Sequence, residues 1–192
     1  MEEDSKTMHW KLRAAIASGA VVVAGVPNLS AQAKDTTHAQ HHAAAPAAAA
    51  ASGAKSPLAW DAATKTVTFA LSAGVFDFNG YTNGRATLTV PPKSNVIMNF
   101  SQDDGTPHSA IIIEDKDPMP TSADQPAIPR AYTNKASEGL PQGAKDVIKF
   151  TAPESGSFRI FCGVPGHGLS GMWIRFKVDP AAKEPKWETQ AK

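Results

Sequence analysis

The chain has few residues of several kinds, and each shortage excludes a class of protein. It has one cysteine among 192 residues, so it cannot form an internal disulfide. Aromatic residues make up 7% of the chain and the formal net charge is +1, which argues against a nucleic-acid binder with a strongly basic face. The sequence contains no Gly-rich phosphate loop, no HExxH pair and no GxSxG elbow. It therefore shows none of the common motifs of nucleotide-binding proteins, metallopeptidases or serine hydrolases.

The N-terminal segment is typical of an export signal. Residues 1–13 are polar and end in two basic side chains, an apolar run follows at residues 14–26, and an A-x-A cleavage site ends at Ala33. The apolar run is shorter than the ~20 residues that a membrane-spanning helix needs, so a membrane anchor is the less favoured alternative. We expect residues 1–33 to direct export, to the periplasm or to the outer face of the cytoplasmic membrane.

A segment of low complexity follows at residues 34–57. It is rich in Ala and Pro and has no strand period, which is typical of a flexible linker. Three histidines within it, His38, His41 and His42, are of a type that binds transition metals, but a solvated linker is the favoured interpretation.

From residue 58 onward, short segments alternate apolar and polar residues and are separated by turn residues. Val67, Phe69 and Leu71 fall on one face of such a segment, because successive side chains of a strand point to opposite sides. Seven or eight segments of this kind, without a convincing helix, predict an all-β protein. We expect an antiparallel Greek-key β-sandwich over residues 58–180.

Two parts of this region lack the strand pattern. Residues 115–144 are rich in proline and form the longest connection, which predicts a functional or partner-facing loop. Residues 181–192 are expected to form a C-terminal tail.

The single cysteine lies in a Gly-rich stretch, CGVPGHGLSGM, at residues 162–172. Cys162 continues the inward phase of the strand pattern before it, and Met172 shares the inward phase of the pattern after it. His167 lies in the loop between them. We expect this loop to bring Cys162, His167 and Met172 to one end of the sandwich.

A second histidine can reach the same end of the sandwich. His108 opens the apolar segment HSAIIIE and shares its phase with Ala110 and Ile112. One thiolate, two imidazoles and a weak thioether form the ligand set of a mononuclear blue copper centre. The sequence therefore predicts one copper ion, cycling between Cu(I) and Cu(II).

Other interpretations of these residues explain less. Taken singly, a cysteine or methionine is most often a core side chain. A structural zinc site rarely uses methionine, and a dinuclear copper centre needs two cysteines. A Cys–His nucleophile pair needs an orienting third group and a substrate cleft, and the sequence suggests neither.

The same residues resemble a known family. The stretch FCGVPGHGLSGMW is similar to the copper loop of cupredoxins, and most closely to that of sulfocyanins. FDFNGYTNGRATLTVP and TPHSAIII resemble the sulfocyanin pattern further upstream, whereas rusticyanin-like proteins are the nearest alternative, with the same Cys-x4-His-x4-Met spacing. The resemblance covers residues 76–178 apart from the long loop. It implies a type 1 copper site with the ligands His108, Cys162, His167 and Met172.

The resemblance also implies a function. The protein is expected to be a small, monomeric electron carrier rather than an enzyme, exchanging electrons with cytochromes or a terminal oxidase near His167. We expect Phe161 and Trp173 to wall the site, and Ser109 to tie the two ligand segments together near the cysteine sulfur. An apolar collar around His167 is expected to dock the partner, because electron-transfer encounters use small interfaces. This collar comprises Val164, Pro165, Gly166, Gly168 and Leu169.

A second class of function stays open from the sequence. A copper storage, delivery or sensing protein outside the cytoplasm could use the same ligands, with the linker histidines as an auxiliary site. Thiolate ligation in a rigid site favours the carrier, because a delivery protein must release its metal. An oxidase or reductase would need further copper centres, and the chain lacks the His-x-His pairs that build them.

Overall fold

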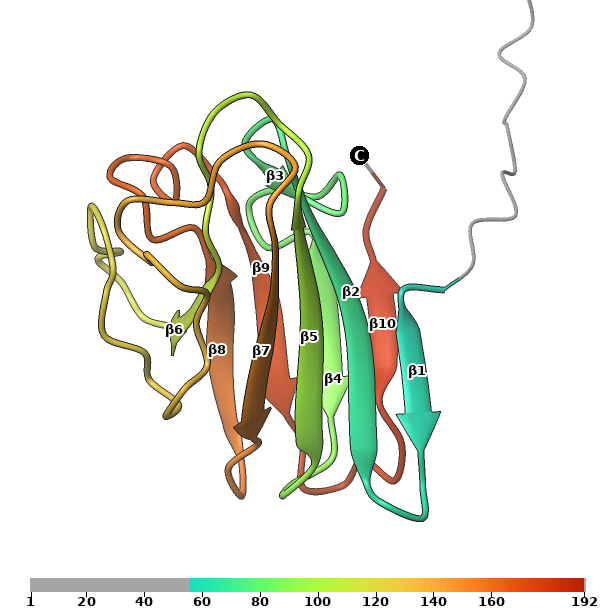
Figure 1. Cartoon of the computed structure of the whole chain (residues 1–192). Coiled ribbons are helices and arrows are strands. Elements are labelled where there is room, and N and C mark those ends of the chain that lie inside the picture. Colours follow the sequence, from blue (N-terminus) through green and yellow to red (C-terminus); the bar gives the residue numbers. More distant parts are fainter. Residues whose placement is uncertain (1–55, 192) are drawn as a thin grey trace, which may run out of the picture. The chain divides into compact units, whose positions relative to one another are not determined.

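Alternating apolar residues form the strands of two β-sheets that pack face to face (Figure 1). The structure is a computed structural model that describes residues 56–191; the expected export signal and nearly all of the expected linker lie outside them. The first sheet contains β1 (Leu58–Asp61), β2 (Thr66–Gly74), β3 (Asp77–Phe78), β5 (Asn95–Gln102) and β7 (Lys145–Thr151). The second contains β4 (Ala86–Val90), β6 (Ile111–Glu114), β8 (Gly156–Phe161), β9 (Trp173–Val178) and β10 (Lys186–Thr189).

The strand order confirms a β-sandwich but corrects the expected strand direction. The first sheet has the order β1-β2-β5-β7 with β3 beside β2, and the second has the order β10-β4-β9-β8-β6. The pairs β2–β5 and β4–β9 are parallel and the others antiparallel, so both sheets are mixed. The parallel pairs arise because the chain crosses to the opposite sheet before it returns beside its earlier strand. Within the described residues, no helix is long and apolar enough to cross a membrane.

The core lies between the two sheets, where the sequence pattern placed it. Val67, Phe69 and Leu71 of β2 are buried and pair in register with Val96, Met98 and Phe100 of β5. The facing sheet contributes a matching set of buried side chains, which includes Leu88, Ile160, Ile174 and Phe176.

The expected C-terminal tail contains a strand of the second sheet. In β10, Trp187 lies opposite Leu88 of β4, and its ring centroid is 5.0 Å from that of Phe69. The expected domain boundary at residue 180 was therefore too early. One short strand with a single large apolar residue leaves too weak an alternation to be recognised in the sequence.

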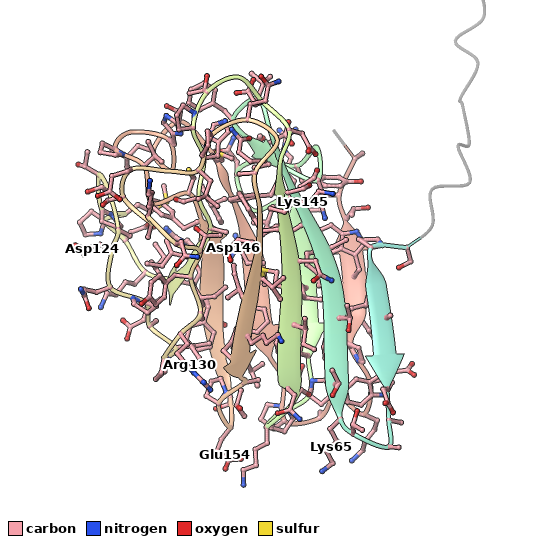
Figure 2. All side chains as sticks on the ribbon, in the orientation of Figure 1. Lys65, Asp124, Arg130, Lys145, Asp146 and Glu154 are labelled. Carbon is pink, nitrogen blue, oxygen red and sulfur yellow. The ribbon has the colours of Figure 1, made fainter. Side chains whose placement is uncertain are left out.

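The long loop at residues 115–144 covers the outer face of the second sheet. Its Met119, Ala123 and Ala136 pack with outward-facing side chains of β6, β8 and β9 in a second apolar cluster. Figure 2 labels Asp124 and Arg130 on this loop, and both are exposed. The sandwich thus has a third layer on one side, and this layer lies next to the loop that joins β8 to β9.

Candidate metal centre

The β8–β9 loop and the segment before β6 meet at one end of the sandwich. This is the end opposite the turns that carry Lys65 and Glu154 in Figure 2. Cys162 directly follows β8 and Met172 directly precedes β9. The amide of Cys162 donates to the carbonyl of Met172 at 3.1 Å, and the amide of Met172 donates to the carbonyl of His167 at 3.1 Å. These bonds close the loop and bring its three expected ligands together.

His108 reaches the site from an isolated β-bridge before β6 and not from the strand itself. The sequence placed it at the start of a strand, but β6 begins three residues later, at Ile111. Two backbone hydrogen bonds pair His108 with Leu140, at 3.3 and 2.7 Å. This bridge places the imidazole of His108 beside the β8–β9 loop.

The three strong donors form a small triangle. Nδ1 of His108 lies 3.1 Å from Nδ1 of His167, and Sγ of Cys162 lies 3.9 and 3.6 Å from these two nitrogens. A point about 2.1 Å from all three atoms exists at the centre of a triangle with these sides, close to the ~2.0–2.3 Å of metal bonds to imidazole and thiolate. The triangle therefore fits one transition-metal ion.

Burial and donor type favour copper for that ion. Cys162, His108 and Met172 are fully buried, and Met172 belongs to the same core cluster as Cys162. A trigonal set of one thiolate and two imidazoles, with a thioether as a weak further ligand, is the donor set of type 1 copper. Only His167 among the four is partly exposed.

The surroundings of the donors act on their protonation. Burial raises the pKa of the Cys162 thiol, and hydrogen bonding from Ser109 opposes this rise. Burial also lowers the pKa of His167, and the nearby His108 lowers it further. His167 therefore tends to stay neutral, which is the form that binds a metal, whereas the thiol needs the metal's positive charge to lose its proton.

A carboxylate stands behind the first histidine. Oδ2 of Asp104 lies 3.0 Å from Nε2 of His108, on the side of the ring away from the donor triangle. The pKa of Asp104 is lowered mainly by this hydrogen bond with His108. Sequence reasoning missed Asp104; the available signal was an acidic residue four positions before the histidine in the polar turn DDGTPH.

Ser109 connects the two ligand segments, as the sequence suggested. The amide of Gly163 donates to Ser109 Oγ at 3.0 Å, and the Ser109 hydroxyl donates to the carbonyl of Ala136 at 2.6 Å. Its oxygen lies 3.9 Å from Cys162 Sγ. Because its proton goes to Ala136, Ser109 also ties the long loop to the site.

Both expected wall residues lie behind the site. Phe161 and Trp173 point to the outer face of the second sheet and belong to the cluster under the long loop, away from the core cluster that holds Cys162. The aromatic ring that contacts the ligands is that of Phe76, whose centroid is 4.7 Å from His167 and 5.8 Å from His108. Phe76 has a φ of 55°, which non-glycine residues rarely adopt. This turn conformation sets the direction of the ring, and the alternation of residues in the sequence does not predict it.

The expected collar is only partly at the surface. Pro165 and Leu169 are exposed, whereas Val164 and Gly166 are half-buried. Gly168 is buried, and a side chain at this position would overlap the ring of Phe161, so this glycine serves packing. The β2–β3 turn provides a further apolar residue at this end, Val75, which is 71% exposed.

Comparison of the sequence with known proteins matches the chain to sulfocyanins. The family described as the Sulfocyanin (SoxE) domain matches residues 53–186. Sulfocyanin of Sulfolobus acidocaldarius is 27% identical over 105 residues, which are 51% of this chain and 53% of that protein, so the chain spans about half the length of this relative.

Auracyanins and rusticyanins are among the similar solved structures. Auracyanin from Roseiflexus castenholzii is 21% identical, with a TM-score of 0.46 over 59% of this chain and 97% of its own. Rusticyanin from Thiobacillus ferrooxidans is 23% identical, with a TM-score of 0.44 over 60% of this chain and 82% of its own. The family match spans most of the chain and includes all four ligand positions, so the chain belongs to the sulfocyanin family of blue copper proteins.

Proposed function

We propose that this blue copper protein is exported and carries single electrons between respiratory redox proteins. The bound copper supplies the one-electron change between Cu(II) and Cu(I). The protein's residues hold the donors in one arrangement that suits both states. The proposal of export is supported by the signal-like pattern of residues 1–33.

The observation that carries the proposal is the donor triangle itself. The nitrogens of His108 and His167 and the sulfur of Cys162 lie 3.1–3.9 Å apart, a spacing at which all three can bind one ion. Donors that stay in place when the charge of the metal changes lower the cost of electron transfer. Two of these residues are fully buried, which opposes easy release of the metal and disfavours a delivery protein.

His167 is the expected point of electron exchange. It is the one ligand that is partly exposed, and exposed apolar residues of two loops, Val75, Pro165 and Leu169, lie at the same end of the sandwich. A small apolar surface suits brief contacts with a redox partner such as a cytochrome.

A spectrum of the purified protein with added Cu(II) tests the copper carrier directly. We expect an intense visible thiolate-to-copper band and a narrow copper hyperfine splitting in EPR. Both should vanish on reduction and return on reoxidation without loss of copper. Cys162→Ser should abolish the band. A pale solution, or copper that a modest chelator removes, would favour storage or delivery instead.

The docking surface is tested by a charge placed beside His167. Val164→Asp should slow electron exchange with a c-type cytochrome, measured by stopped flow, and leave the visible spectrum unchanged. The control is Val147→Asp, which adds the same charge on the outer face of β7, where Val147 is 50% exposed. Equal rates for the two variants would exclude the proposed docking surface.

A further inference from the structure

We propose that Asp104 is a positioning residue that holds His108 in its metal-binding form and lowers the reduction potential of the copper centre. The inference rests on the proposed function, since it concerns the potential of an electron carrier. It assigns a role to a carboxylate that is itself no ligand of the metal.

The contact with Asp104 determines which nitrogen of His108 carries the proton. A neutral imidazole has one N–H, and an ionised carboxylate can only accept hydrogen bonds. Because Nε2 of His108 lies 3.0 Å from Oδ2 of Asp104, the proton belongs on Nε2. Nδ1 then presents its lone pair to the donor triangle, where it faces Cys162 and His167.

The turn around Asp104 is built to hold the carboxylate. The amides of Gly105 and Thr106 donate to its two oxygens at 2.7 and 3.3 Å. The fully buried Gln102 donates to the carbonyls of Asp104 and Thr106 and accepts the amide of Asp104, at 2.9, 2.6 and 3.0 Å. A buried glutamine whose amide closes the turn makes the contact to His108 a fixed part of the structure.

The charge of Asp104 acts on the metal through the imidazole. The side chain of His108 is fully buried and that of Asp104 is 16% exposed, so water screens this pair poorly. A carboxylate that accepts from the distal N–H makes the imidazole a more basic ligand. A more basic ligand stabilises the more positive, oxidised state, and the reduction potential falls.

Three variants separate the parts of this role. Asp104→Asn keeps an acceptor for Nε2–H but removes the charge, and Asp104→Ala removes both. Asp103→Asn removes an equal charge one residue away, from an exposed side chain whose hydrogen bond is with Ser101 and not with His108. The potentials of the copper-loaded proteins are measured by voltammetry, and the tautomer of His108 in the metal-free proteins by 15N NMR.

We expect Asp104→Asn to raise the ratio of reduced to oxidised copper about tenfold at a given potential. For one electron this is a rise of about 59 mV in the reduction potential. Asp103→Asn should change the same ratio less than about threefold, because water and salt screen its exposed charge. Asp104→Ala should also raise the reduction potential. In the metal-free Asp104→Ala variant, His108 should populate the Nδ1–H tautomer, which the metal-free wild type should lack.

The outcomes distinguish this inference from the proposed function. A wild-type protein without a type 1 spectrum would overturn the proposed function. A wild type with that spectrum, but with equal shifts in Asp103→Asn and Asp104→Asn, would overturn only the role of Asp104. An unchanged tautomer in Asp104→Ala would overturn the positioning part.

Discussion

At the scale of single residues, Ser109 joins three segments of the chain through one hydroxyl group. It accepts from the amide of Gly163 in the β8–β9 loop and donates to Ala136 in the long loop, while its own backbone follows the ligand His108. Both partners of the hydroxyl are buried. The hydroxyl therefore satisfies two buried backbone groups that have no access to water.

Ser109→Ala should lower the free energy of unfolding of the metal-free protein by about 2 kcal/mol, because it leaves a buried donor and a buried acceptor unpaired. Urea unfolding measures the change. Ser170→Ala is the control, since the exposed Ser170 hydroxyl donates only to the carbonyl of Gly166 at 3.0 Å and its loss should cost less than about 0.5 kcal/mol. Equal losses in the two variants would contradict the connecting role of Ser109.

The metal ligands could be predicted from the sequence, but part of their surroundings could not. Cys162, His167 and Met172 lie in one short loop, so their spacing and phase were enough to bring them together. Asp104 and Phe76 contact the ligands through turns, where no periodicity links a position to a direction.

At the scale of elements, an arginine on β8 anchors the start of the long loop. Arg159 is buried, and its guanidinium contacts Asp115 at 2.6 Å and Asp117 at 3.2 Å. The same guanidinium lies 4.7 Å from the ring centroid of Trp173. Further along, the long loop contacts the β8–β9 loop, because the carbonyl of Thr121 accepts a hydrogen bond from the amide of Gly166 at 2.8 Å.

Arg159→Met should therefore destabilise the protein by about 3 kcal/mol, because it removes the buried cation that pairs with the nearly buried Asp115. The contact with Asp117 adds little to this cost, since the side chain of Asp117 is 80% exposed. Arg175→Met is the matched control: Arg175 lies opposite Arg159 on β9 and also contacts Asp115, but it is 46% exposed and should cost below about 1 kcal/mol. Guanidinium unfolding of both variants measures the difference. A similar cost for both would mean that burial does not strengthen the anchor.

The elements themselves were only partly predictable from the sequence. The alternation in β2 and β5 identifies strands and their inner faces, because one side of each strand is buried. It contains no information on pairing direction, so the parallel pairs β2–β5 and β4–β9 were missed. The long loop has no periodicity, and its position over the second sheet depends on contacts such as that of Arg159 with Asp115.

At the scale of the whole molecule, the fold holds the metal donors in place by itself. Two sheets, a covering loop and the bond network of Ser109 fix both ligand segments. The metal is therefore expected to add stability to a structure that already exists.

Removal of copper should leave the far-UV circular dichroism of the protein unchanged. Copper should raise the free energy of unfolding by about 4 kcal/mol where its free concentration is a thousand times the dissociation constant. Thermal unfolding of the metal-free and loaded proteins measures this gain. A random-coil spectrum after copper removal would show that the metal is needed for folding.

The ligand pair His108 and His167 has a mechanical consequence. The two residues are 59 positions apart in the chain, so a metal bound to both joins distant points of the polypeptide. When residues 56 and 191 are pulled apart in an optical trap, the segment between these two ligands carries no tension until the metal bonds break. Its length is about 210 Å at ~3.5 Å per residue. The copper centre would then appear as a separate rupture step that releases this hidden length, and the step would be absent from the metal-free protein.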